Sequence, residues 1–247
     1  MNWIYVRYGV LIAVSTYTWF KFLKEWYEKL YQKHLLFLKM HNCVVMYNSA
    51  GKRIGGWPCD DSDDPADDDI KGINVIRQYF YCGQYESLLY FIRTAKESLY
   101  IATMFIHVQC IVDELLAAHE RNVIIKIIVD YNYNKSGTCI QQLQRAGIEV
   151  LYYVPPNPDQ CSRFHYNSVV KDFSRDTQDG YLCTVLLNWS VNSAGVVSNY
   201  EIFNFISKFE LVAQFYDNFE DAWNTISEMN ETNDYIKDTL REINMYQ

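Results

Sequence analysis

The sequence predicts an α/β protein built on a mixed sheet flanked by helices. The chain has 247 residues, which is enough to bury one sizeable core. Between residues 86 and 226, short apolar segments alternate with segments in which apolar residues recur at helical spacing. Residues 123–130 are almost wholly apolar, as in a strand covered on both faces. These observations favour one main domain with strands and helices in alternation.

The individual elements follow from local patterns along this domain. Residues 139–146 end at Gly147, which is a common residue just past a helix C-terminus. Residues 209–226 carry apolar side chains at helical spacing. We expect helices over 86–96, 112–120, 139–146 and 209–226, and strands over 99–106, 123–130, 148–154, 167–172, 181–187 and 201–206.

The N-terminus has the composition of a membrane anchor. Residues 1–20 contain one charge, Arg7, and four lysines follow between residues 21 and 33. The positive-inside rule then places the body of the chain in the cytosol. The uninterrupted segment 8–20 covers only ~20 Å, so a full span also needs the residues before Arg7. We predict a membrane anchor and basic stalk over 1–36; a cleaved signal peptide and an amphipathic helix are the alternatives.

Charge and cysteine content narrow the function classes. The net charge is −8 and the pI about 5.1, which argues against a generally nucleic-acid-binding surface but leaves room for a local basic groove. The seven cysteines are scattered without an even framework. This pattern predicts reduced thiols and a domain that faces the cytosol.

One segment carries a pattern of catalytic residue types. His165, Asn167 and Asp172 form an H-x-N-x-x-x-x-D string. Asn188 and Trp189 follow in a second segment, and Glu201 ends an N-x-E triplet after that. A histidine can attack phosphorus, and a cation two residues later on the same side of a strand would hold the phosphate oxygens. Here that position is Asn167, which donates hydrogen bonds but carries no charge.

These segments resemble the motifs of the phospholipase D superfamily, H-x-K-x-x-x-x-D followed by G-S-x-N-W-(S/T) and N-x-E. The chain is most similar to the single-motif, membrane-anchored branch of Zucchini, the mitochondrial cardiolipin hydrolase. The resemblance implies a phospholipase D-like domain over 84–228 and a C-terminal tail over 229–247. It also implies a phosphodiesterase that cleaves single-stranded RNA in piRNA maturation or hydrolyses cardiolipin, at the outer mitochondrial membrane.

The same resemblance assigns roles to the motif residues. The reaction needs two histidines, so two chains would form a homodimer with both His165 side chains at one phosphate. Asn188 would bind near the phosphate, Glu201 would orient the partner's imidazole, and Asp172 would hold the loop near the site. No metal would be required for catalysis.

Two departures from the motif predict an impaired site. Asn167 replaces the lysine, and Val185-Leu186 replace the Gly-Ser pair. Reduced phosphodiesterase activity is therefore expected; the alternative is a non-catalytic paralogue that acts as a binding or scaffold protein at the mitochondrial surface.

Residues 37–83 are predicted to form a divergent acidic linker or a degenerate zinc-finger insertion. Seven aspartates lie between residues 60 and 69, as in a solvated linker. Relatives carry a zinc-binding insertion here, and four side chains of suitable type are present: His41, Cys43, Cys59 and Cys82. They lack the usual spacing of paired ligands, so buried cysteines are the alternative to structural zinc.

Overall fold

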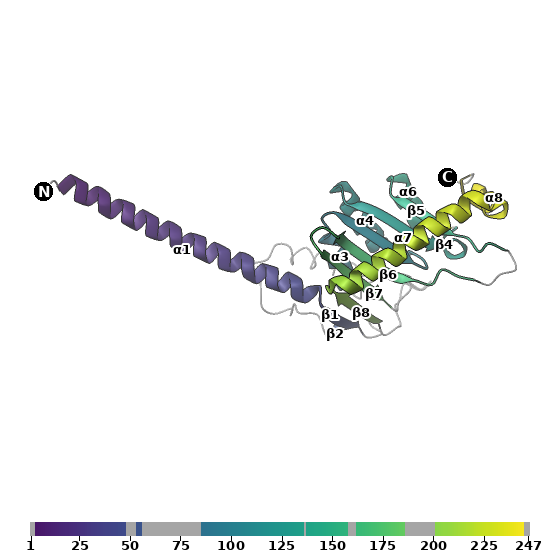
Figure 1. Cartoon of the computed structure of the whole chain (residues 1–247), viewed down its shortest axis with the longest axis horizontal. Helices are drawn as coiled ribbons and strands as arrows, with labels where there is room; N and C mark the ends of the chain where they lie inside the picture. Colours follow the sequence, from purple (N-terminus) through teal and green to yellow (C-terminus); the bar gives the residue numbers. More distant parts are fainter. Residues whose placement is uncertain are drawn as a thin grey trace. The chain divides into compact units, whose positions relative to one another are not determined.

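The computed structural model describes residues 3–47, 53–55, 85–135, 137–157, 162–185 and 201–244. The chain divides into two compact units, Met1–Met40 and His41–Gln247. The second unit contains the sheet and the motif residues, and Figure 1 shows its strands and helices.

The first unit is one long helix, α1 (Trp3–Met40). Its large apolar side chains are exposed, among them Trp3, Trp19 and Trp26. Lys21 and Lys24 lie 3.9 Å from Glu25 and Glu28, respectively, one turn further along the helix. The predicted membrane span would require a helix that is long and apolar enough to cross a lipid bilayer. Within the described residues, no helix meets this requirement.

The second unit is organised around an eight-stranded sheet in the order β2-β1-β8-β7-β6-β3-β4-β5. β3, β4 and β5 are parallel to one another, and the other pairings are antiparallel. The mixed sheet predicted from the sequence is confirmed. The strands are β1 (Cys43–Tyr47), β2 (Arg53–Gly55), β3 (Ser98–Thr103), β4 (Ile124–Asp130), β5 (Glu149–Tyr153), β6 (Asn167–Ser174), β7 (Asp179–Val185) and β8 (Glu201–Ile206).

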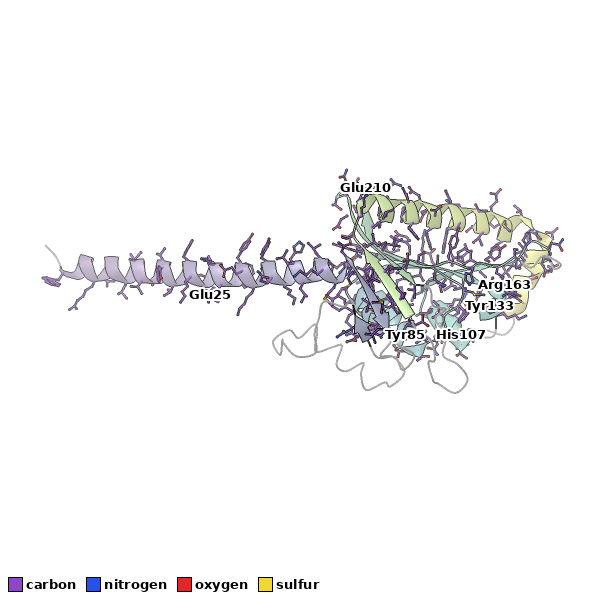
Figure 2. All side chains as sticks on the ribbon, turned by 90° about the horizontal axis from the view of Figure 1, so that it is seen from below. Glu25, Tyr85, His107, Tyr133, Arg163 and Glu210 are labelled. Carbon is purple, nitrogen blue, oxygen red and sulfur yellow. The ribbon has the colours of Figure 1, made fainter. Side chains whose placement is uncertain are left out.

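Helices cover both faces of the sheet (Figure 1). On one face, Phe219 and Ile226 of α7 pack against Ala102 and Ile128 of the central strands. α3, α4 and α6 lie on the other face, below the sheet in Figure 2. The helices of this unit are α3 (Glu86–Arg93), α4 (Gln109–Glu120), α5 (Tyr131–Asn134), α6 (Thr138–Arg145), α7 (Phe209–Thr232) and α8 (Asp234–Asn244).

Two features differ from the expectations drawn from the sequence. β1 and β2 lie within the segment predicted as a linker, and β1 pairs along its whole length with β8. Of the described cysteines, Cys43, Cys139 and Cys183 are thiols outside any disulfide, whereas Cys110 is disulfide-bonded. The expectation of reduced thiols is therefore wrong for Cys110.

Candidate active site

Asn167 and Glu201 lie at one end of the sheet, where β3 and β4 end and β6 and β8 begin. Thr103 of β3 pairs with Asn167 of β6, and Val185 of β7 pairs with Phe203 of β8. Ser168 pairs with Thr184, so the same register aligns Asn167 with Val185 one position further on. Paired residues of neighbouring strands project from the same face of a sheet. Thr103, Asn167, Val185 and Phe203 therefore form one row on one face.

His165 and Glu201 each lie two residues before a member of this row. Glu201 is the first residue of β8, and His165 lies in the segment just before β6. The His165 side chain is exposed, whereas Glu201 is 4% exposed and has interaction partners of its own. The exposed imidazole is the group that a substrate can reach.

Asn167 is held in place by its neighbour across the strand. The buried Thr103 hydroxyl donates a hydrogen bond to the Asn167 side-chain oxygen at 2.9 Å. The amide group of Asn167 can donate hydrogen bonds, but it supplies no positive charge to a phosphate. This position is the one at which the motif has lysine.

Asp172 lies at the opposite end of β6 from His165, about 23 Å further along the strand. Its carboxylate accepts hydrogen bonds from the backbone N–H groups of Lys96, Glu97 and Ser98, at 2.7–3.1 Å. Asp172 also has a positive φ of 49°, a conformation that aspartate tolerates better than most residues. The side chain thus fixes the turn that leads into β3, rather than a loop beside His165.

Lys171 is fully buried and does not lie near Asn167. Its Nζ donates hydrogen bonds to Thr94 Oγ1 at 2.8 Å and to the Phe91 carbonyl at 3.2 Å, and it contacts His41 Nε2. The ammonium also lies over the rings of Phe91 and Tyr181. Burial lowers the pKa of Lys171 to about 7, although the nearby Asp172 acts in the opposite direction. This lysine is committed to the interior and cannot replace the missing motif cation.

Two buried polar side chains connect the segments around His165, and sequence reasoning missed both. One carboxylate oxygen of Asp130 accepts from Asn132 N and the other from Phe164 N, each at 2.9 Å. Asn134 donates to the Met104 and Asp130 carbonyls and accepts from Ile106 N. Burial raises the pKa of Asp130 above that of an ordinary aspartate. The only sequence signal was the position of Asp130 at the end of a buried strand.

The remaining predicted site residues are described only in part. Asn188 lies outside the described residues, as do Cys59 and Cys82 of the predicted zinc set. Cys43 is half-buried, and His41 is fully buried with its Nε2 against Lys171. No group of three or more His, Cys, Asp or Glu side chains suited to a metal occurs among the residues that the structure describes. The zinc site stays a prediction.

The sequence matches a family model described as the PLD-like domain of cardiolipin synthase, over residues 88–223. That range is more than half of the chain. The chain belongs to the PLD-like family. The matched range of this PLD-like domain begins in α3 and ends in α7, so it contains β3–β8 and His165, Asn167 and Glu201. A search of curated proteins found no significant match.

Two bacterial proteins are among the solved structures that are similar to this chain. Nuc from Salmonella typhimurium, described as a phospholipase D family member, is 21% identical, with a TM-score of 0.44 over 56% of this chain and 84% of Nuc. NucT from Helicobacter pylori is 19% identical, with a TM-score of 0.47 over 58% of this chain and 89% of NucT.

Proposed function

We propose that the protein is a phosphodiesterase of the phospholipase D type whose rate is reduced by the loss of the motif lysine. The observation that supports the proposal is the strand pairing, which puts Asn167 at the start of β6 and Glu201 at the start of β8, with the exposed His165 just before β6. The imidazole of His165 would attack phosphorus and Glu201 would orient a second imidazole. Asn167 would donate hydrogen bonds to the phosphate in place of an ammonium.

The second imidazole comes from a second copy of the chain in this proposal. One motif histidine is present per chain, and a twofold homodimer is the assembly that supplies another identical residue. The substrate would be a phosphodiester of single-stranded RNA, as in piRNA maturation, or of a phospholipid such as cardiolipin. One motif and an N-terminal apolar segment are the features that this chain would share with the Zucchini-like branch.

The proposal is tested by measuring hydrolysis of a fluorogenic phosphodiester together with sedimentation of the same protein. We expect slow hydrolysis that His165→Ala abolishes, and a dimer at micromolar concentration. Asp179→Asn, which changes an exposed carboxylate at the far end of β7, is the control for surface changes. A stable monomer, or native hydrolysis that survives His165→Ala, would contradict the proposal.

The two departures from the motif support a second candidate function. Val185 is buried and aligned with Asn167, at a position where the motif has glycine. A bulkier side chain there limits the approach of a phosphate to His165. A non-catalytic protein that binds or scaffolds at the mitochondrial surface would retain the PLD-like fold without hydrolysis.

We further propose that α1 attaches the protein to the outer mitochondrial membrane, with the PLD-like domain in the cytosol. The support is the set of exposed tryptophan and other aromatic side chains along α1, followed by lysines from residue 21 onward. Such side chains suit the interface between lipid and water.

Removing residues 1–36 should release the protein from membranes into the soluble fraction. We expect the full chain to float with mitochondrial-lipid vesicles in a density gradient, and the truncated chain to remain at the bottom. Protease treatment of intact mitochondria then reports the side on which the PLD-like domain lies. Flotation of the truncated protein would show that α1 is not the attachment site.

A further inference from the structure

A continuous set of planar side chains ends at Arg163, two residues before His165. The Arg163 guanidinium carbon is 5.5 Å from the centre of the Tyr133 ring. Tyr133 faces Phe105 at 5.8 Å between ring centres, and Phe105 faces His107 at 5.0 Å, with both pairs inclined by 32°. Figure 2 shows the labelled His107, Tyr133 and Arg163 close together at this edge of the sheet.

Buried hydrogen bonds hold the three segments that carry this set. Asn134 joins the segment after β3 to α5, because its amide bonds the Met104 carbonyl and Ile106 N on either side of Phe105. Asp130 joins α5 to the segment before β6 through Asn132 N and Phe164 N. Asp130 and Asn134 are 0% and 1% exposed, respectively. The planar groups are therefore preorganised relative to His165.

The two side chains at the ends of this set are exposed to solvent. Arg163 and His107 are exposed, whereas Tyr133 and Phe105 are half-buried between them. His107 is further fixed by a 3.0 Å hydrogen bond between its Nε2 and the Tyr133 carbonyl. A second cation, the exposed Lys135, lies over the ring of Tyr131. Two exposed cations, Arg163 and Lys135, thus lie over aromatic rings of α5.

We propose that Arg163 and Tyr133 form a stacking subsite for a base of a single-stranded nucleic acid adjacent to the phosphodiester at His165. The exposed guanidinium, which lies over the Tyr133 ring, can stack on the π-face of any base, and a cation two residues from His165 can also pair with the neighbouring phosphate. A lipid headgroup has no planar ring that could stack on these side chains. The inference rests on the proposed phosphodiesterase site and specifies its substrate class.

Binding is measured with the full chain carrying His165→Ala, so that hydrolysis does not affect the signal. The probes are a fluorescent single-stranded oligonucleotide, an abasic oligonucleotide with the same number of phosphates, and vesicles of anionic phospholipid. We expect binding of the base-containing strand to be about 5- to 100-fold tighter than that of the abasic strand. Arg163→Lys should reduce this preference while leaving binding of the abasic strand unchanged, because the charge is kept and the plane is lost.

Two further variants make the test specific. Tyr133→Leu removes the ring and should also reduce the preference; if it fails to fold, Arg163→Lys carries the test alone. Arg175→Lys is the matched control, since the Arg175 guanidinium lies 5.6 Å from the Phe173 ring at the other end of β6. This variant should keep the full preference.

The outcomes separate the subsite from the proposed function. Equal binding of the two oligonucleotides, or stronger binding to vesicles than to the base-containing strand, would overturn the subsite. Hydrolysis by the native protein without a base preference would leave the phosphodiesterase proposal standing and refute the subsite. A base preference without any hydrolysis would support the subsite and refute the phosphodiesterase proposal.

Discussion

Asn167→Lys is expected to raise the rate of phosphodiester hydrolysis by about 10²–10³-fold. The reason is that an ammonium at this position would stabilise negative charge that develops on the phosphate oxygens in the transition state. The position is suited to this role, because Asn167 lies two residues after His165 and in the row of Thr103 and Val185. The measurement is the initial rate of the native protein and the variant on the same fluorogenic phosphodiester.

Two controls identify the source of the gain. Asn167→Gln lengthens the side chain without adding charge and should leave the rate near that of the native protein. His165→Ala in the Asn167→Lys background should abolish the new activity. If Asn167→Lys alone has little effect, Val185→Gly and Leu186→Ser should open the approach to His165. A native rate equal to that of Asn167→Lys would show that the missing charge is no handicap.

Lys171 should make the free energy of unfolding increase between about pH 7 and pH 10. Its pKa is about 7 in the native state and 10.5 in an unperturbed lysine, so in this range the unfolded chain binds a proton that the native state does not. Stability therefore rises with pH, by up to about 1.4 kcal/mol per pH unit for one proton, and levels off below pH 7. Urea unfolding at several pH values measures this slope.

Lys171→Met should remove this part of the pH dependence. Methionine fills similar volume in the interior and does not titrate, so the variant curve should be flatter than the native curve by up to one proton. Lys126→Met, in the partly exposed position over Trp223, is the control for loss of a lysine as such. Parallel curves for the native protein and Lys171→Met would show that Lys171 keeps an ordinary pKa in the folded state.

The strands and helices of the main domain were predictable because their apolar residues are local and periodic. The expected strand over 123–130 is β4 (Ile124–Asp130), and the expected helix over 139–146 is α6 (Thr138–Arg145). β1 was missed because its five residues precede a long acidic segment, and its partner β8 lies far away in the sequence. Pairing over such a separation leaves little trace in a local pattern.

The residue types of the candidate site were predictable from the sequence. The hydrogen bonds that hold its segments together were not. The spacing of His165 and Asn167 identified the edge of the sheet, but the roles of Asp130 and Asn134 depend on which backbone groups end β3 and precede β6. Residues separated by an even number of positions on a strand project from the same face, so the sequence pattern allowed Lys171 to lie on the face of His165. Its burial against His41 and Phe91 depends on segments 80 or more residues away.

The pairing of β1 with β8 has a consequence for synthesis of the chain. Residues 43–47 leave the ribosome early, but their partners at 201–206 are made only after nearly the whole sheet-forming sequence has followed. Until then the edge of β1 that pairs with β8 has no hydrogen-bonding partner strand. Because such distant contacts form slowly and leave strand edges unpaired, the nascent chain is most prone to misassociation during this interval. Slowed translation between these two segments would therefore lower the yield of folded protein more than slowing after residue 206.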